Sequence, residues 1–107
     1  MDLEYPRLQF ADGFWWRRAE EGCLRLGITR EAADQLTYVT QVELPAVGVH
    51  FRAGDAFGMI ESQKVISDLI APVSGTVLAH NAALREQPFL VNSDPEGAGW
   101  LLVVRPS

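Results

Sequence analysis

A polar break interrupts two apolar runs in the middle of the sequence. Residues 56–60 are apolar, residues 65–71 are mostly apolar, and residues 61–64 (Glu-Ser-Gln-Lys) separate them. Two buried strands joined by a short polar segment are typical of a β-hairpin. A further turn signal, residues 72–75 (Pro-Val-Ser-Gly), follows the second run. The sequence therefore predicts a hairpin with Lys64 at or near its turn.

Lys64 is the only lysine of the chain, because the other eight basic residues are all arginines. A guanidinium group stays protonated and is a poor nucleophile, whereas an ε-amine can be acylated. A solubilising surface charge is the alternative, and a biased amino-acid composition would also make lysine rare. Neither alternative explains why the remaining lysine falls at a predicted turn. The pattern favours covalent modification of Lys64, which would give an attached group long reach from a fixed platform.

Other chemistries find little support in the sequence. The single cysteine, Cys23, has Leu24 and Leu26 as neighbours, which favours a buried apolar side chain over a nucleophile. The two histidines, His50 and His80, have no Cys/His spacing typical of a metal site. The formal charge of −5 and the lack of a Lys/Arg cluster exclude nucleic-acid binding. No signal peptide or apolar run of ~20 residues is present, so we expect a cytoplasmic protein that does not bind membranes.

The remaining pattern predicts a small, mostly-β domain. We expect one unit over residues 1–107, with its core in residues 14–105, organised as a β-barrel or sandwich with two short helices. Thr29 is the expected N-cap of the first helix. Besides the hairpin, we expect strands at 14–18, 22–28, 38–44 and 99–104. We expect one helix at 30–36, a second that begins at Asn81 and covers 82–86, and a turn at 93–97.

Several segments resemble a known carrier family. The clearest are residues 58–65 (Gly-Met-Ile-Glu-Ser-Gln-Lys-Val) and 71–75 (Ala-Pro-Val-Ser-Gly), with further similar segments at 42–48 and 90–101. From roughly Gly22 to Arg105 the sequence resembles the H protein of the glycine cleavage system, a lipoyl carrier. The resemblance implies a barrel-sandwich hybrid of the lipoyl/biotinyl type.

The resemblance also assigns roles to residues around the hairpin. Lys64 would carry lipoate in amide linkage, and Glu61 and Gly75 match positions that the family uses for recognition by its lipoylating enzyme. The chain would be a non-catalytic carrier rather than an enzyme. It would pass an aminomethyl group from a pyridoxal-phosphate glycine decarboxylase to a tetrahydrofolate-dependent aminomethyltransferase. A dihydrolipoamide dehydrogenase would reoxidise the carrier, and we expect that carrier to be a monomer.

The chain departs from the family pattern at three places. Phe14-Trp15-Trp16 stands where members commonly have His-Glu-Trp. The lysine is flanked by Gln63 and Val65 in place of Val and Ala. The sequence ends at Ser107 without the usual C-terminal helix. These departures leave open an H-like lipoyl carrier for another pathway, such as heterodisulfide-reductase-like sulfur oxidation. A biotinyl carrier and an unmodified interaction module are further alternatives, although biotinyl carriers typically flank the lysine with methionines.

Overall fold

A computed structural model describes residues 14–18, 22–63 and 66–107 of the 107-residue chain. Within these residues strands predominate and the helices are short, which confirms the mostly-β prediction. The elements are β1 (Phe14–Arg18), β2 (Leu24–Ile28), α1 (Arg30–Asp34), β3 (Val39–Glu43), β4 (His50–Phe51), β5 (Ala56–Ser62), β6 (Ile66–Ile70), β7 (Gly75–His80), α2 (Ala83–Glu86), α3 (Leu90–Ser93) and β8 (Leu102–Pro106).

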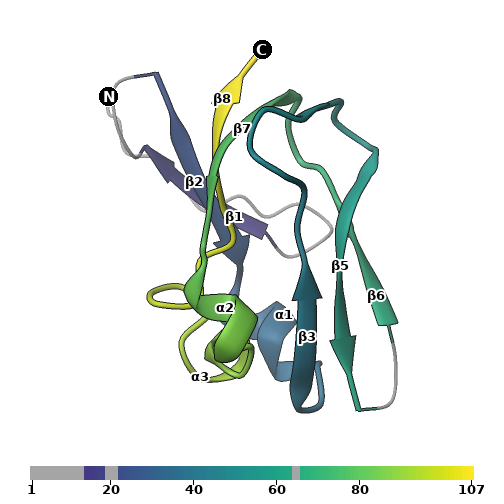
Figure 1. Cartoon of the computed structure of the whole chain (residues 1–107). Coiled ribbons are helices and arrows are strands. Elements are labelled where there is room, and N and C mark those ends of the chain that lie inside the picture. Colours follow the sequence, from purple (N-terminus) through teal and green to yellow (C-terminus); the bar gives the residue numbers. More distant parts are fainter. Residues whose placement is uncertain (1–13, 19–21, 64–65) are drawn as a thin grey trace.

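The strands form two antiparallel sheets that face each other across one core (Figure 1). One sheet has five strands in the order β1-β2-β8-β7-β4, and the other has three in the order β3-β5-β6. The helices lie toward the end of the molecule at which β3 begins and β5 ends (Figure 1). β6 begins at this same end (Figure 1).

The core is built from alternate residues of both sheets, because successive side chains of a strand point to opposite faces. In β2, Leu26 is fully buried while Arg25 is exposed. The buried side chains include Leu24, Leu26, Val77, Leu102 and Val104 of the five-stranded sheet and Val39, Ile60 and Leu69 of the three-stranded sheet.

Thr29 caps α1 as predicted, since its Oγ1 accepts a hydrogen bond of 3.1 Å from the backbone N–H of Ala32. The second helix also forms where it was expected, and the side-chain oxygen of Asn81 accepts a 3.1 Å bond from the N–H of Ala83. The expectation of two helices was wrong by one. α3 follows Pro88 after a break, and its four residues are too few to show a helical period in the sequence.

The last strand begins later than predicted. Residues 97–100 belong to a turn, in which the N–H groups of Gly97 and Gly99 both donate to the carbonyl oxygen of Asp94. Trp100 then donates to the carbonyl oxygen of Gly97. The apolar run predicted as one strand from residue 99 therefore becomes part of a turn, and β8 starts at Leu102.

Two isoleucines beside the β5–β6 turn allow us to measure how much core packing contributes to the free energy of unfolding. Ile60 is only 2% exposed, whereas Ile66 is 60% exposed. We expect Ile60→Ala to lower the free energy of unfolding by about 2–5 kcal/mol, because a buried side chain is lost and a cavity remains. Ile66→Ala should change it by about 0.5 kcal/mol or less. Urea denaturation followed by circular dichroism checks both values, and equal losses would contradict the fold.

Candidate functional site

The predicted hairpin is formed by β5 and β6, which pair antiparallel in the three-stranded sheet. The last residues that they pair before the turn are Glu61 and Ile66, and residues 63–65 lie between the two strands in the sequence. Lys64 itself lies outside the described residues. Gln63 and Ile66, the described residues on either side of position 64, are both exposed. The chain therefore reaches the surface on both sides of the predicted attachment site.

The body of the hairpin is fixed in the core. Ile60 of β5 and Leu69 of β6 are buried, and both belong to the cluster that joins the two sheets. Gly58 allows β5 to approach β3 closely, since a Cβ at this position would collide with the carbonyl oxygen of Glu43. A backbone oxygen cannot move aside as a flexible side chain can. The close packing of β3 against β5 therefore requires glycine at position 58.

Pairing with β3 continues to the end of β5. Val39 is opposite Ser62 in the sheet register. One residue further, the N–H of Gln63 donates a 3.1 Å hydrogen bond to the carbonyl oxygen of Tyr38. The backbone is thus held by its neighbour up to the last described residue before Lys64.

Glu61 lies on the outer face of the three-stranded sheet. Its neighbours in sequence, Ile60 and Ser62, are buried, so the Glu61 side chain points away from the core. None of the described residues forms a hydrogen bond or ion pair with its carboxylate. Cross-strand pairing places Gln41 and Ile66 on either side of Glu61 and forms a neighbouring row of Glu43, Met59 and Asp68.

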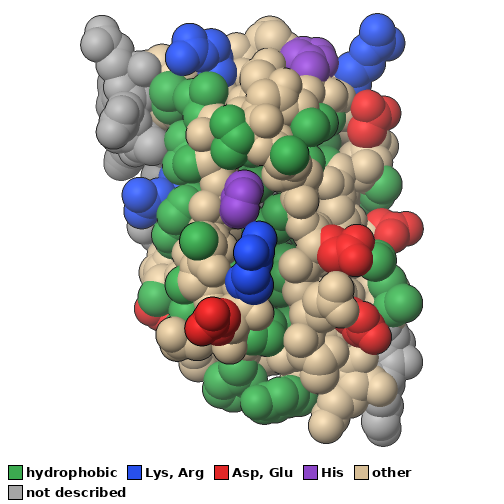
Figure 2. Space-filling view, in the orientation of Figure 1, with side chains coloured by type: hydrophobic (Ala, Val, Ile, Leu, Met, Phe, Trp, Pro, Cys, Tyr) green, Lys and Arg blue, Asp and Glu red, His purple; other side chains and the backbone are tan. Residues whose placement is uncertain are grey.

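This outer face combines negative charge with apolar surface. Glu43, Glu61 and Asp68 are its acidic residues, and the described residues of β3, β5 and β6 include no Lys, Arg or His. Figure 2 shows acidic side chains gathered on the side of the molecule that this sheet forms. A partner with a basic surface would be attracted to this face, because complementary charge steers association.

Gly75 lies in the other sheet, at the start of β7, and is buried. The β6 strand runs away from the turn near Glu61, and Ala71 then donates to the carbonyl oxygen of Asp55, just before β5 begins. Gly75 is thus near the opposite end of the hairpin from Glu61. A Cβ at Gly75 would lie 2.6 Å from the carbonyl oxygen of Arg105. The structure does not bring Glu61 and Gly75 together, and it gives Gly75 a packing requirement of its own.

The sequence predicted no role for Tyr38, whose carbonyl oxygen bonds to Gln63 of the hairpin, or for Asn92, which holds the backbone around Tyr38. The side-chain amide of Asn92 bonds to the backbone on both sides of Tyr38. The available signal was an asparagine inside the resembling segment 90–101. Its partners are more than 50 positions away, so the sequence pattern does not reveal them.

Two clefts lie beside β3 and α2. One, of about 540 Å³, is lined by residues that include Tyr38, Arg85 and Phe89. The other, of about 520 Å³, includes Glu43, His80 and Arg85. Neither is lined by a residue from β5 or β6.

Other features of the described residues add no second reactive centre. Cys23 is a buried free cysteine, as predicted. No group of three or more His, Cys, Asp or Glu side chains among these residues could hold a metal ion. Within the same ranges no helix is long and apolar enough to span a membrane.

Comparison with known proteins gives the same family throughout. The chain is 51% identical over 106 residues to the glycine cleavage system H protein of Mycobacterium avium, which covers 99% of this chain and 77% of that protein. It is 45% identical to the glycine cleavage system H protein of Gloeobacter violaceus, over 98% of this chain and 82% of that protein. The crystal structure of a glycine cleavage system H protein from Mycobacterium marinum superimposes with a TM-score of 0.86 and is 41% identical, covering 92% of this chain and 81% of that one.

The family model for the glycine cleavage H-protein matches residues 7–107. This match confirms the resemblance found in the sequence, and the structural likeness confirms the barrel-sandwich fold. The family match also confirms the prediction that the chain is a non-catalytic carrier within a multienzyme system rather than an enzyme. The chain belongs to the glycine cleavage H-protein family.

Proposed function

We propose that this chain carries a lipoyl group on Lys64 and shuttles an aminomethyl group between the enzymes of glycine cleavage. The observation that carries the proposal is the place of the only lysine. In a chain of the H-protein family, it falls between Gln63 and Ile66, at the turn of a hairpin that is fixed in the core. Family membership supports the lipoyl group and the pathway, and the hairpin supports the site.

Attachment requires a nucleophilic amine that an enzyme can reach. The Lys64 nitrogen attacks the carbonyl carbon of activated lipoate, an amide bond forms, the activating group leaves with the bonding electrons, and the amine releases a proton. None of the eight arginines offers an equivalent nucleophile. Because β3 holds the hairpin backbone as far as Gln63, the modifying enzyme would lose less entropy in ordering this part of the chain when it binds.

The attached group supplies the redox chemistry. Once attached to Lys64, the lipoyl group would supply a disulfide that can be reduced and can carry a transferred group. The contribution of this chain is to hold the attachment point away from its own core. Tethering then keeps the group at a high effective concentration near any enzyme docked beside the hairpin.

We assign Glu61 and Gly75 to recognition by the lipoylating enzyme. Glu61 is three residues before Lys64, and its carboxylate points outward with no partner among the described residues. β6 alone spans roughly 17 Å at the usual rise per residue, so an enzyme that reads both positions covers the length of the hairpin. Gly75 acts through the backbone shape at the start of β7, since its packing leaves no room for a side chain.

We place the docking of glycine decarboxylase, aminomethyltransferase and dihydrolipoamide dehydrogenase on the outer face of the three-stranded sheet. Glu43, Glu61 and Asp68 give this face its charge, and Met59 and Ile66 give it apolar surface. This face lies next to position 64, so an enzyme bound there would have the lipoyl group of Lys64 within reach. The cytoplasm is the compartment in which we place this system.

Lipoylation is tested by intact mass spectrometry after incubation with a lipoate–protein ligase, lipoate and ATP. We expect one added lipoyl group on the wild-type chain and none on Lys64→Arg, which lacks an acylable amine. Lys64→Arg keeps the charge and should change stability by about 0.5 kcal/mol or less. A wild-type chain that stays unmodified, while a known H protein is lipoylated in the same tube, would disprove the attachment site.

The role of Glu61 is tested with a matched acidic residue from the same face. Glu61→Gln should lower kcat/KM for lipoylation about tenfold, the loss expected when a charge-assisted hydrogen bond to the enzyme is removed. Glu43→Gln removes the same charge from β3, two residues along the strand from Gln41, the partner of Glu61, and should change the rate less than about twofold. Steady-state rates over a range of carrier concentrations give both values. Equal effects would assign the result to general charge rather than to recognition.

The pathway is tested by reconstitution with glycine decarboxylase. Lipoylated wild-type chain should support release of carbon dioxide from labelled glycine, and Lys64→Arg treated in the same way should not. The authentic H protein of the decarboxylase's own system is the positive control. If the lipoylated chain is inactive while that control works, lipoylation stands and glycine cleavage is replaced by another lipoyl-dependent pathway.

A further inference from the structure

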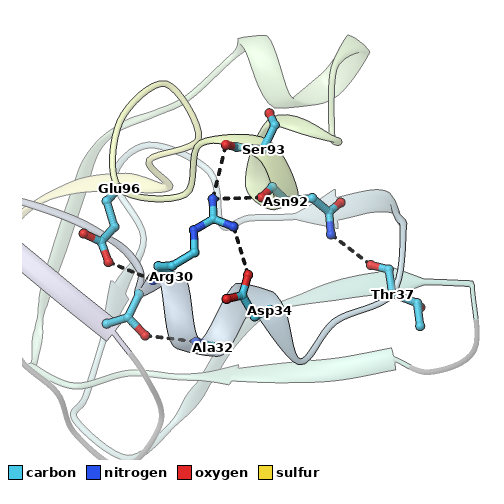
Figure 3. Close-up of polar contacts among 8 residues, drawn as sticks. Arg30, Ala32, Asp34, Thr37, Asn92, Ser93 and Glu96 are labelled. Carbon is cyan, nitrogen blue, oxygen red and sulfur yellow. Dashed lines mark hydrogen bonds and ion pairs between the residues drawn. The ribbon is translucent and has the colours of Figure 1, made fainter.

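α3 supports the turn end of the hairpin through one side chain, which bonds to the backbone at the start of β3. The Asn92 side-chain oxygen accepts a 2.9 Å hydrogen bond from the N–H of Val39, and its Nδ2 donates a 3.0 Å bond to the carbonyl oxygen of Thr37. Figure 3 shows the Asn92 side chain reaching toward Thr37. One amide therefore holds the backbone on both sides of Tyr38.

The position of Asn92 is itself fixed by α1. The Nη2 of Arg30 donates to the carbonyl oxygens of Asn92 and Ser93, at 3.0 and 3.2 Å, and its Nη1 bonds to Asp34 at 3.0 Å (Figure 3). The backbone N–H of Arg30 donates to the carboxylate of Glu96 at 2.7 Å. The guanidinium group thus satisfies carbonyl groups at the end of α3, which a short helix leaves without partners.

Tyr38 links this support to the hairpin. Its ring stacks on Phe89, with the ring centres 4.8 Å apart, so the segment leading into α3 contacts it a second time. Its carbonyl oxygen accepts the N–H of Gln63, whose next neighbour in the chain is Lys64. The contacts therefore run from Arg30 through Asn92 and Tyr38 to Gln63.

Pairing between β3 and β5 does not by itself fix the backbone at the start of β3. The register of β3 against β5 shifts between Val39 and Gln41, so that Thr40 is an extra residue in the pairing. Such a bulge interrupts the ladder of hydrogen bonds and bends the strand. Asn92 bonds to the buried Val39, the residue next to this bulge and the last residue of β3 that is paired with β5 on the side of the turn.

We propose that Asn92 is a positioning residue for modification of Lys64, because it fixes the Tyr38 carbonyl group that holds Gln63. The inference rests on the proposed lipoylation of Lys64. Without the Asn92 amide, residues 37–39 would sample other positions, and only a fraction of the molecules would present the turn correctly. The apparent affinity of the lipoylating enzyme falls in proportion to that fraction.

The chain offers a matched control in Asn81. Its side-chain amide also bonds to distant backbone, donating to the carbonyl oxygens of Ala98 and Trp100 at 2.8 and 2.9 Å. These bonds hold the turn before β8, and the side-chain oxygen of Asn81 accepts the N–H of Ala83; none of these partners belongs to the described residues of β3, β5 or β6. Asn92→Ala and Asn81→Ala therefore remove similar bonds, and only the first affects the support of Tyr38.

The experiment measures lipoylation kinetics and amide exchange of both variants well below their melting temperatures. We expect both to melt earlier than wild type. Asn92→Ala alone should raise the KM for the carrier about tenfold, with kcat changed less than about twofold. Hydrogen exchange at the Gln63 amide should accelerate about tenfold in Asn92→Ala and stay unchanged in Asn81→Ala.

Asn92→Asp is the second variant if the alanine variant does not fold. It keeps an acceptor for the Val39 N–H and loses the donor to Thr37, so its KM should lie between those of wild type and Asn92→Ala. Equal KM values for the Asn92 and Asn81 variants, or a wild-type KM in Asn92→Asp together with unchanged Gln63 exchange, would overturn the proposal. Absence of lipoylation in the wild type would instead overturn the function on which it rests.

Discussion

The two-sided pairing of β5 is the constraint on which the rest of the structure depends. This strand is bonded to β3 on one edge and to β6 on the other, and its inward side chain Ile60 is part of the core. The end of the strand cannot shift without breaking one of these ladders or exposing apolar surface. A carrier has to combine a mobile arm with a fixed attachment point, and a central strand meets the second requirement better than a surface loop.

Support of the turn comes from parts of the chain far apart in sequence. The bulge at Thr40 weakens the β3–β5 ladder close to the turn, and Asn92 bonds to the backbone at that place. Arg30 then connects α3 to α1. The short helices are too small to be stable alone. Their contribution is to fill the end of the sandwich and to hold the strand that the hairpin pairs with.

The sequence was informative where local chemistry decides the structure. The polar break at 61–64 predicted the β5–β6 turn, and the hydroxyl of Thr29 predicted the start of α1. Prediction failed where partners are distant. Nothing near Asn92 shows that its amide reaches Thr37 and Val39. Gly99 looked compatible with the start of the last strand, but its bond to the carbonyl oxygen of Asp94 places it in the turn before β8.

In the candidate site, too, the sequence predicted the features that depend on neighbouring residues and missed those that depend on distant partners. Glu61 could be placed beside the turn because it is close to Lys64 in sequence, and the structure adds that its side chain points outward. Gly75 could be selected from the resemblance, but its closeness to the carbonyl group of Arg105 depends on how β7 meets β8. The role of Lys64 still rests on the residue type, its place in the chain and the family to which the chain belongs.

The three-stranded sheet has one more consequence for how copies of this chain meet. Its outer strands are β3 and β6, and another strand could extend the backbone edge of β6 and the part of the β3 edge that lies beyond the amide of Val39, which Asn92 occupies. Each described strand of this sheet carries a carboxylate on its outward face and no cation, so two such edges approach with like charge. The same charge that attracts a basic enzyme therefore opposes edge-to-edge aggregation, and one surface serves both selectivity and solubility.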